Sequence, residues 1–265
     1  MADVVVLGCG YTGGTVARLA RSEGESVVAT VRSEERAAPL RLDGFEVVVA
    51  DPLDAEAIAA FVDEKTHVIV TFPPDGETDA RVAPHFARAA AITYLSSTGV
   101  YSGVSGVVDD TTPLPAAPSE TARTTLAAED AWRNVGATVL RSPGIYGADR
   151  GLHLRIARGQ HRIAGDGSTY TSRIHVRDLA ALLLAARKKR GETYVVGDTE
   201  PTTQRQISEW VAREYGVAMP PFVPAAEVHE SLRADRRVDG SRALRELGVT
   251  LEFPSWREGM AKPTL

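Results

Sequence analysis

The segment VVVLGCGYTGG, residues 4–14, decides the fold. Three valines and a leucine in succession predict a strand that is buried on both faces, as strands of parallel sheets are. The glycines then turn the chain, and a helical pattern of apolar residues follows at once. A strand, a glycine-rich turn and a helix in this order are typical of the first unit of an α/β sheet.

Gly8, Gly10 and Gly13 have the G-x-G-x-x-G spacing of a dinucleotide-binding turn. One glycine makes the tight turn, one lets the backbone approach a pyrophosphate, and one packs the helix on the strand. The pyrophosphate would lie over the free N–H groups at the start of the helix. We therefore predict a dinucleotide site that includes Tyr11 and Thr12. The alternative is a turn whose glycines only permit tight packing.

Strand and helix patterns alternate through the first 142 residues. Parallel neighbours need crossover helices, so the alternation predicts an α/β fold with a Rossmann-type doubly wound parallel sheet. We expect a dinucleotide-binding domain at 1–147 and a smaller mixed substrate lobe at 148–265, interleaved with the first. The predicted strands are 4–7, 27–31, 45–50, 67–71, 92–95 and 137–140, and the main predicted helices begin after Ser33 and Asp54 and cover 78–90 and 119–134.

Composition narrows the class of protein. The net charge is −5, and no basic run exceeds that at 187–190, which argues against a nucleic-acid binder. The single cysteine, Cys9, fits a reducing compartment. The first apolar run lacks a basic flank and is too short for a signal peptide or a membrane span. We expect a cytoplasmic protein with a small-molecule substrate, no membrane partner and, because the histidines lack metal-ligand spacing, no metal.

Further segments carry a family resemblance. Together with the glycine turn they occur in family order over essentially the whole chain: YLSSTGVY at 94–101, LRSPGIYG at 140–147, RIHVRDLA at 173–180, SRALRELG at 241–248 and PSWREG at 254–259. The chain resembles the extended or atypical short-chain dehydrogenases/reductases of the NAD-dependent epimerase/dehydratase type. The resemblance also implies a homodimer that pairs through the helices at 78–90 and 119–134.

The end of the second strand favours NADP(H) over NAD(H). An NAD site usually has an acidic residue about 20 residues after the glycines, but here Arg32 and Ser33 come first and Glu34 follows. Arg32 can donate to a 2′-phosphate, which a carboxylate would repel. The alternative is an NAD(H) site in which Arg32 is only a solvated residue at the end of the strand. The resemblance implies further cofactor contacts from Asp51, Pro52, Leu53, Thr71, Phe72, Pro73, Ser96, Pro143 and Ile145.

The usual proton relay of the family is missing. In the family a serine binds the reacting oxygen, a tyrosine is the acid/base, and a lysine four residues later assists it. Ser97 matches the serine. Aligning LAAE at 126–129 on the family helix places Thr121 at the tyrosine and Thr125 at the lysine. The chain has no tyrosine between Tyr101 and Tyr146 to replace it.

Another acid could substitute. The resemblance points to Ser97 and Tyr101 as catalytic candidates, and to Tyr146, Arg173 and His175 beside the substrate. The alternative for the tyrosines is packing, and for His175 a structural hydrogen bond. Sugar-nucleotide members commonly have an arginine where this chain has Thr171, which weakens the case for such a substrate.

Two main functions therefore stay open, beside a third possibility that the lobe catalyses a non-redox reaction with the dinucleotide as a structural element. One is an NADP(H)-binding, epimerase/dehydratase-like oxidoreductase that acts on a small carbonyl, hydroxyl or sugar-like substrate with a non-standard acid/base. The other is a dinucleotide-binding sensor or partner-binding protein without redox turnover.

Overall fold

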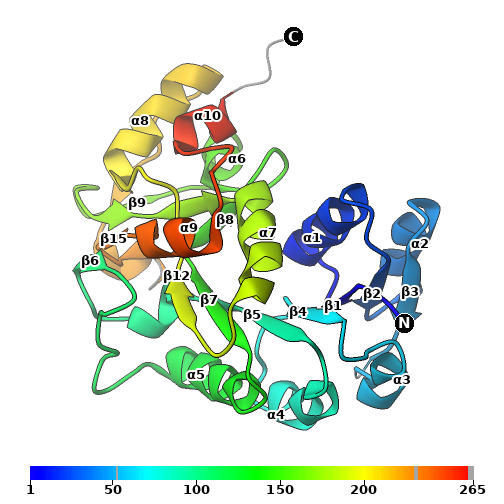
Figure 1. Ribbon diagram of the computed structural model, residues 1–265. Coiled ribbons are helices and arrows are strands. Elements are labelled where there is room, and N and C mark those ends of the chain that lie inside the picture. Colours follow the sequence, from blue (N-terminus) through cyan, green and yellow to red (C-terminus); the bar gives the residue numbers. More distant parts are fainter. Residues whose placement is uncertain (52, 230–231, 262–265) are drawn as a thin grey trace.

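The structure is a computed structural model that describes residues 1–51, 53–229 and 232–261 (Figure 1). The first predicted strand, β1 (Val4–Leu7), lies inside a seven-stranded sheet of order β12-β7-β5-β4-β1-β2-β3, in which all neighbours run parallel. This confirms the predicted Rossmann-type doubly wound fold. The other strands of the sheet are β2 (Val27–Val31), β3 (Glu46–Val49), β4 (His67–Val70), β5 (Ala91–Ser97), β7 (Thr138–Ser142) and β12 (Thr193–Val195).

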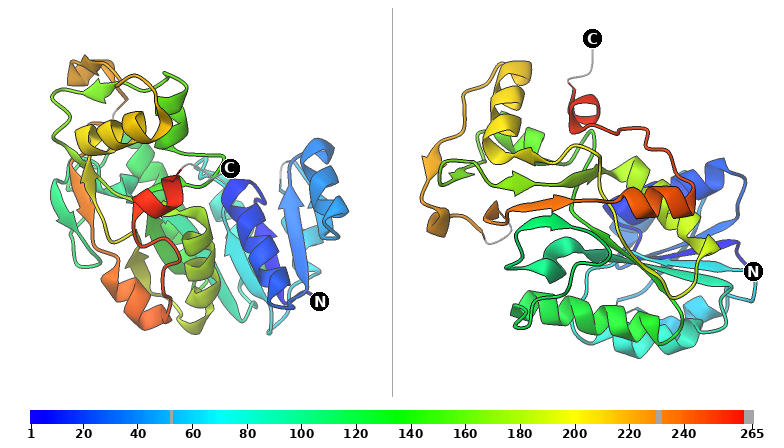
Figure 2. Two further views of the ribbon diagram at one scale, coloured as in Figure 1. Left: turned by 90° about the horizontal axis from the view of Figure 1, so that it is seen from above. Right: turned by 60° about the vertical axis from the view of Figure 1, so that its left-hand side comes forward.

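Alternate residues of β1 enter two separate cores, because successive side chains of a strand point to opposite faces. Val4 and Val6 pack in one core, and Val5 and Leu7 in the other. Figure 2 shows the helix layers on the two faces. The first layer holds α1 (Tyr11–Ser22), α2 (Glu34–Leu42), α7 (Val176–Ala185) and α9 (Ser241–Leu247); the second holds α3 (Ala55–Ala59), α4 (Thr78–Val82), the 3-10 helix η1 (Ala83–Phe86) and α5 (Glu120–Arg133).

The strand order reverses between β1 and β4. From β1 the chain moves outward to β2 and β3, and then returns to β4 on the other side of β1. The loops that leave β1 and β4 therefore part at the same edge of the sheet. In open parallel sheets the crevice at such a point binds ligands, and the glycine turn of residues 8–13 lies there.

Several elements differ from the prediction. The helix expected at 78–90 is divided into α4 and η1, with Pro84 in the first turn of η1, because proline has no N–H to continue the α-helical ladder. The sequence pattern at 225–233 predicts a helix, but its described part contains only the short 3-10 helix η4 (Ala225–Glu227). The pattern at 193–196 predicts a short extended piece of the lobe, but β12 joins the central sheet beside β7.

The remaining elements form small pairs beyond the carboxyl end of β7. After Pro143 the chain enters β8 (Gly144–Tyr146), which pairs in parallel with β11 (Arg173–His175). The other members are β6 (Gly106–Val108) with β15 (Arg236–Val238), β9 (Ile163–Ala164) with β14 (Phe222–Val223), β10 (Tyr170–Thr171) with β13 (Thr202–Thr203), the helices α6 (Leu152–Ala157), α8 (Gln204–Tyr215) and α10 (Trp256–Met260), and the 3-10 helix η2 (Thr98–Tyr101). The 3-10 helix η3 (Ala186–Lys188) instead continues α7, and Ala186 packs in the core beneath the first helix layer.

These outer elements have their own apolar cluster, in which Ile156, Ile207, Trp256 and Met260 pack around Tyr146. The division at residue 147 stays an interpretation of the sequence. The sheet takes β12 from beyond that point, and α7 packs against α1. No helix in the described part of the chain is both long and apolar enough to span a membrane.

Four buried histidines predict that acid destabilises the fold. Burial lowers the pKa of His67 to about 3 and that of His153, His161 and His175 to about 4. The pKa of histidine in an unfolded chain is about 6.5, so below that pH the unfolded chain binds more protons than the folded chain. The free energy of unfolding should therefore fall from pH 7 to pH 5, by about 1–2 kcal/mol for each histidine.

Urea unfolding of two variants as a function of pH checks this expectation. Within the described residues, both ring nitrogens of His161 lack a hydrogen-bond partner, so His161→Leu should reduce the pH dependence by one histidine's share. His85→Leu, which removes an exposed histidine, is the matched control and should leave the dependence unchanged. An equal slope in the wild type and His161→Leu would contradict the assignment.

Candidate functional site

The glycine turn has the shape that its spacing predicts. Gly8 has φ +86°, and a Cβ there would lie 2.7 Å from the backbone nitrogen of Phe72. A Cβ at Gly13 would lie 2.6 Å from Thr71 Oγ1. At Gly10 the nearest atom to an added Cβ is the Gly8 carbonyl oxygen, at 3.9 Å. Packing therefore requires glycine at the first and third positions, while the middle one faces open space.

The start of α1 is free to receive an anion. Its N-cap, Gly10, has no side chain to offer, and the first turn has no acidic residue. By contrast, side chains of Ser119, His175 and Thr203 cap α5, α7 and α8. The Gly14 N–H donates to the Gly10 carbonyl at 2.8 Å, and the N–H groups before it have no acceptor within the helix. The turn thus fits the pyrophosphate of a dinucleotide.

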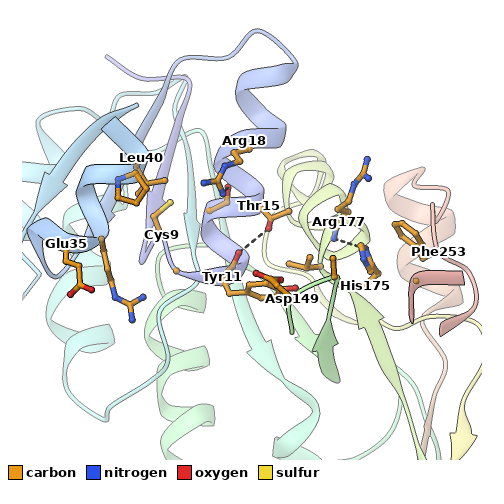
Figure 3. A pocket seen from close by; sticks show the side chains of 17 residues that line it. Cys9, Tyr11, Thr15, Arg18, Glu35, Leu40, Asp149, His175, Arg177 and Phe253 are labelled. Atoms are coloured by element: carbon orange, nitrogen blue, oxygen red, sulfur yellow. Dashed lines mark hydrogen bonds between the residues drawn. The ribbon is translucent and has the colours of Figure 1, made fainter. Parts of the chain in front are cut away.

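A cavity of about 770 Å³ extends from this turn (Figure 3). One wall is the outward face of α1, and α2 lies across from it. The residues that close it on the lobe side include Asp149, His175 and Phe253. Arg36, on the first turn of α2, also lines the cavity. The sequence prediction missed Arg36, although it lies four residues after Arg32 and close to the predicted cofactor pocket.

The other predicted cofactor residues lie at the same edge of the sheet. Arg32 follows β2 directly and is exposed; Asp51 lies just beyond β3, and Thr71 just beyond β4. The Thr71 hydroxyl donates to the Gly8 carbonyl at 2.8 Å, which fastens the loop to the turn. Pro52 lies outside the described residues. Phe72 lies directly against Gly8 of the turn. Ser33, Leu53 and Pro73 follow the carboxyl ends of β2, β3 and β4 but line neither cavity in the described chain.

A second cavity of about 640 Å³ adjoins the first, because Asp149 borders both. It brings together five residues of the sequence prediction: Ser97, Pro143, Ile145, Tyr146 and Arg173. The Ser97 hydroxyl accepts a hydrogen bond from the Gly99 N–H at 3.0 Å. The structure therefore gathers the serine and part of the predicted substrate set at one place.

The second cavity is strongly basic. Its lining contains five arginines, and Asp149 is the sole carboxylate among its described lining residues. The arginines are Arg150, Arg155, Arg158, Arg173 and Arg236. Such a surplus of guanidinium groups suits an anionic ligand. The sequence prediction found Arg173 and missed the other four, although Arg155 and Arg158 show the i,i+3 spacing of one helix face.

Ser96 and Tyr101 lie apart from the cavities, in a buried polar network. The Arg141 guanidinium donates two hydrogen bonds to the Glu129 carboxylate, at 2.9 and 2.7 Å, and a third to the Tyr101 hydroxyl at 2.7 Å. Ser96 donates to Glu129 at 2.5 Å. Burial opposes ionisation of Glu129, but the hydrogen bonds and charge of Arg141 outweigh it and lower its pKa. Neither Ser96 nor Tyr101 borders either cavity in the described chain.

The catalytic prediction for Tyr101 therefore has no support from this geometry. Its side chain is fully buried, and its hydroxyl already accepts from Arg141. The helix α5 supplies no replacement. Thr121 is exposed, and the Thr125 hydroxyl donates to the Thr121 carbonyl at 2.9 Å. Neither threonine lines a cavity formed by the described residues.

His175 has a structural hydrogen bond at the start of α7. Its Nδ1 accepts from the Arg177 N–H at 3.3 Å, and its ring centre lies 3.8 Å from that of Phe253 and 5.2 Å from that of Tyr146. Burial lowers its pKa to about 4, so it is neutral near pH 7. His175 borders the first cavity, but its neutral imidazole does not carry the additional proton that a histidine general acid donates.

Comparison with known proteins agrees with the site. A family model described as NAD(P)H-binding matches residues 8–190, more than half of the chain. The protein therefore belongs to this NAD(P)H-binding family. The match includes Gly10, which lines the first cavity, and Ser97, which lines the second.

The similarity to individual relatives covers nearly the whole chain. Protein YeeZ of Escherichia coli (strain K12) is 24% identical over 278 residues, which cover 96% of this chain and 97% of that protein. A solved protein of unknown function from Silicibacter pomeroyi DSS is 28% identical with a TM-score of 0.81, covering 98% of this chain and 97% of its own. MoeE5 in complex with UDP-glucose and NAD is 20% identical with a TM-score of 0.79, covering 97% and 96%.

The resemblance to epimerase/dehydratase enzymes is thereby confirmed at the level of the fold, and the NAD(P)H-binding family model confirms the class of cofactor. Solved NAD-dependent epimerases and dehydratases share this architecture over nearly their full length. Their identities to this chain are below 20%, so they define the fold and leave the substrate open.

Substitutions in the turn should separate binding from packing. Gly10→Ala places a methyl group in the open space above α1, so we expect dinucleotide affinity to fall at least tenfold with little change in thermal stability. Gly13→Ala forces a clash with Thr71 and should cost about 1–3 kcal/mol of stability. Calorimetric titration with NADPH and thermal unfolding measure the two effects. Unchanged NADPH affinity in a folded Gly10→Ala would contradict a pyrophosphate site.

Proposed function

We propose that the protein is an NADP(H)-dependent, epimerase/dehydratase-like oxidoreductase that acts on a small anionic substrate. The observation that carries this proposal is the junction of the two cavities at Asp149. One cavity begins at a dinucleotide-binding turn, and the other is lined by arginines and by Ser97. A structural neighbour, MoeE5, binds UDP-glucose together with NAD, which supports a substrate beside the nicotinamide. We also propose a cytoplasmic location, because a reducing compartment suits a chain whose single cysteine is Cys9.

The preference for NADP(H) rests on the residues after β2. Arg32 is exposed directly after the strand, and the Ser33 side chain makes no capping hydrogen bond to α2. Arg36 lies on the first turn of the same helix and lines the first cavity. Two guanidinium groups and a hydroxyl match the acceptors of a 2′-phosphate.

Removal of these arginines should weaken NADPH selectively. In Arg32→Ala and Arg36→Ala we expect the Kd for NADPH to rise tenfold or more, while the Kd for NADH changes less than twofold, because only NADPH has the 2′-phosphate. Arg41→Ala is the matched control, since Arg41 lies on the same helix and pairs with Glu34. Equal losses for NADPH and NADH would contradict the assignment.

Asp149 is the acid/base that the geometry offers. It borders both cavities, and the residues at the usual positions are threonines. A bound NADP⁺ would supply the hydride acceptor. Asp149 would take the proton of the substrate hydroxyl as the C–H hydride leaves the carbon, and Ser97 would hold the substrate oxygen. In the reverse direction the protonated carboxyl returns the proton.

The test follows label from [4-²H]NADPH in the presence of a panel of anionic carbonyl compounds. The proposal expects transfer by the wild type, a loss of at least a hundredfold in Asp149→Asn with NADPH affinity retained, and a changed pH profile in Asp149→Glu. Full activity of Asp149→Asn would exclude Asp149 as the base.

A second candidate function has a specific observation in its favour. The α5 positions of the family's tyrosine and lysine are Thr121 and Thr125, and the Tyr101 hydroxyl is engaged by Arg141. A dinucleotide-binding sensor needs no acid/base. Tight NADPH binding with no label transfer to any compound of the panel would favour this function over the enzyme. The homodimer stays a prediction from the resemblance.

A further inference from the structure

The strand pair β8–β11 turns one polar face into the lobe. Arg173 pairs with Gly144, and His175 pairs with Tyr146. Paired residues, and residues two apart on one strand, share a face of the sheet. Tyr146, Arg173 and His175 therefore lie together on one face, whereas Ile145 and Ile174 pack into the core on the other. The polar face borders the inner end of the second cavity, because both Tyr146 and Arg173 line it.

Arg173 is a buried cation without an ion-pair partner. It is 4% exposed, and among the described residues no carboxylate oxygen lies within 4.0 Å of its guanidinium nitrogens. Its Nη2 donates to Thr171 Oγ1, while Nη1 has no hydrogen-bond partner. Burial lowers its pKa to about 10, so it stays charged near pH 7. A buried charge of this kind costs several kcal/mol unless an anion offsets it.

Two further donors lie around Arg173. The Tyr146 hydroxyl and the Trp256 Nε1 are both buried, and neither has a hydrogen-bond partner in the described chain. The Arg173 guanidinium carbon lies 5.7 Å from the centre of the Trp256 ring. Helix α10 approaches so closely that a Cβ at Gly259 would lie 2.7 Å from the Tyr146 hydroxyl. The strands β8 and β11 thus bring two unpartnered donors, those of Tyr146 and Arg173, to the second cavity, although native interiors leave few donors unpartnered. Trp256 packs its ring beside Arg173 and borders neither cavity in the described chain.

Asp198 is the nearest alternative counter-charge. Its pKa is raised to about 7 by burial, against the opposing charge of Arg173, and its Oδ2 has no partner among the described residues. The Asp198 N–H donates to the Arg173 carbonyl oxygen at 2.8 Å, but among the described residues no Asp198 carboxylate oxygen lies within 4.0 Å of the guanidinium nitrogens. The cluster keeps a surplus of donors over acceptors. A ligand that completes it must bring acceptor oxygens and a negative charge.

We propose that Arg173 and Tyr146 form a carboxylate subsite in the second cavity, which both residues line. A guanidinium binds the two oxygens of a planar carboxylate well, and the Tyr146 phenol supplies a further hydrogen bond. This inference rests on the proposed function in taking the second cavity as the substrate site. It narrows the substrate to a compound with a carboxylate group.

The test uses acetate and inorganic phosphate as probes, with saturation-transfer NMR for acetate and competition by phosphate. The wild type should bind acetate, and Arg173→Met should bind it at least tenfold more weakly. Tyr146→Phe should weaken acetate a few fold and serves if Arg173→Met fails to fold. Arg213→Met is the matched control, because it removes an exposed arginine of the lobe that borders neither cavity.

Urea unfolding gives a second readout. Removal of an unpaired buried cation should leave Arg173→Met as stable as the wild type or more stable. A destabilised Arg173→Met that binds acetate normally would overturn the proposal and make Arg173 a structural partner of Asp198. Strong phosphate binding without acetate binding would also overturn it. NADPH binding is measured separately, so that a failed cofactor site with intact acetate binding would contradict the proposed function alone.

Discussion

The close contact between the turn after β1 and the loop after β4 is the constraint on which the rest of the structure depends. Gly8 adopts a positive φ and lies against Phe72, and Gly13 lies against Thr71. Side chains at these glycines would clash with the loop after β4 and push the two loops apart. The Thr71 hydroxyl then closes the contact by donating to Gly8. Because of this contact, α1 begins directly above the sheet edge with its first N–H groups uncovered, and a cavity opens on its outward face.

A second constraint lies deeper, between α5 and β7. The Glu129–Arg141 pair is almost fully buried and has charge-assisted hydrogen bonds on both sides. Ser96 and Tyr101 form hydrogen bonds to this pair in the interior, and the pair links α5 to β7. Removal of one partner would leave an uncompensated buried charge, which costs far more than the pair contributes. On helix α5, Thr121 is exposed, and the Thr125 hydroxyl donates to the Thr121 carbonyl.

The lobe has a concentration of positive charge around the second cavity. Four arginines from the segment 150–173, together with Arg236, converge on a cavity whose sole described carboxylate is Asp149. The same carboxylate borders the first cavity and lies near Tyr11, whose ring lies 5.1 Å from the Arg150 guanidinium carbon. Burial, together with the charge of Asp149, raises the pKa of Tyr11 to about 12. The glycine turn and the second cavity are therefore joined through the short segment that contains residues 147–150.

The sequence by itself determined the fold and the cofactor turn, because hydrophobic runs, glycine spacing and N-cap residues act over a few neighbouring positions. Ser97, Tyr146 and Arg173 could also be proposed from their motifs. Only the tertiary structure decided that the Tyr101 hydroxyl is bound by Arg141 and that β12 completes the sheet. The same holds for the cavity linings, which include Arg36, Arg155 and Arg158. These outcomes depend on contacts between residues far apart in the chain, such as Tyr101 with Arg141 and Arg173 with Trp256. No local pattern records such contacts, since burial and charge pairing are set by the packing of whole elements.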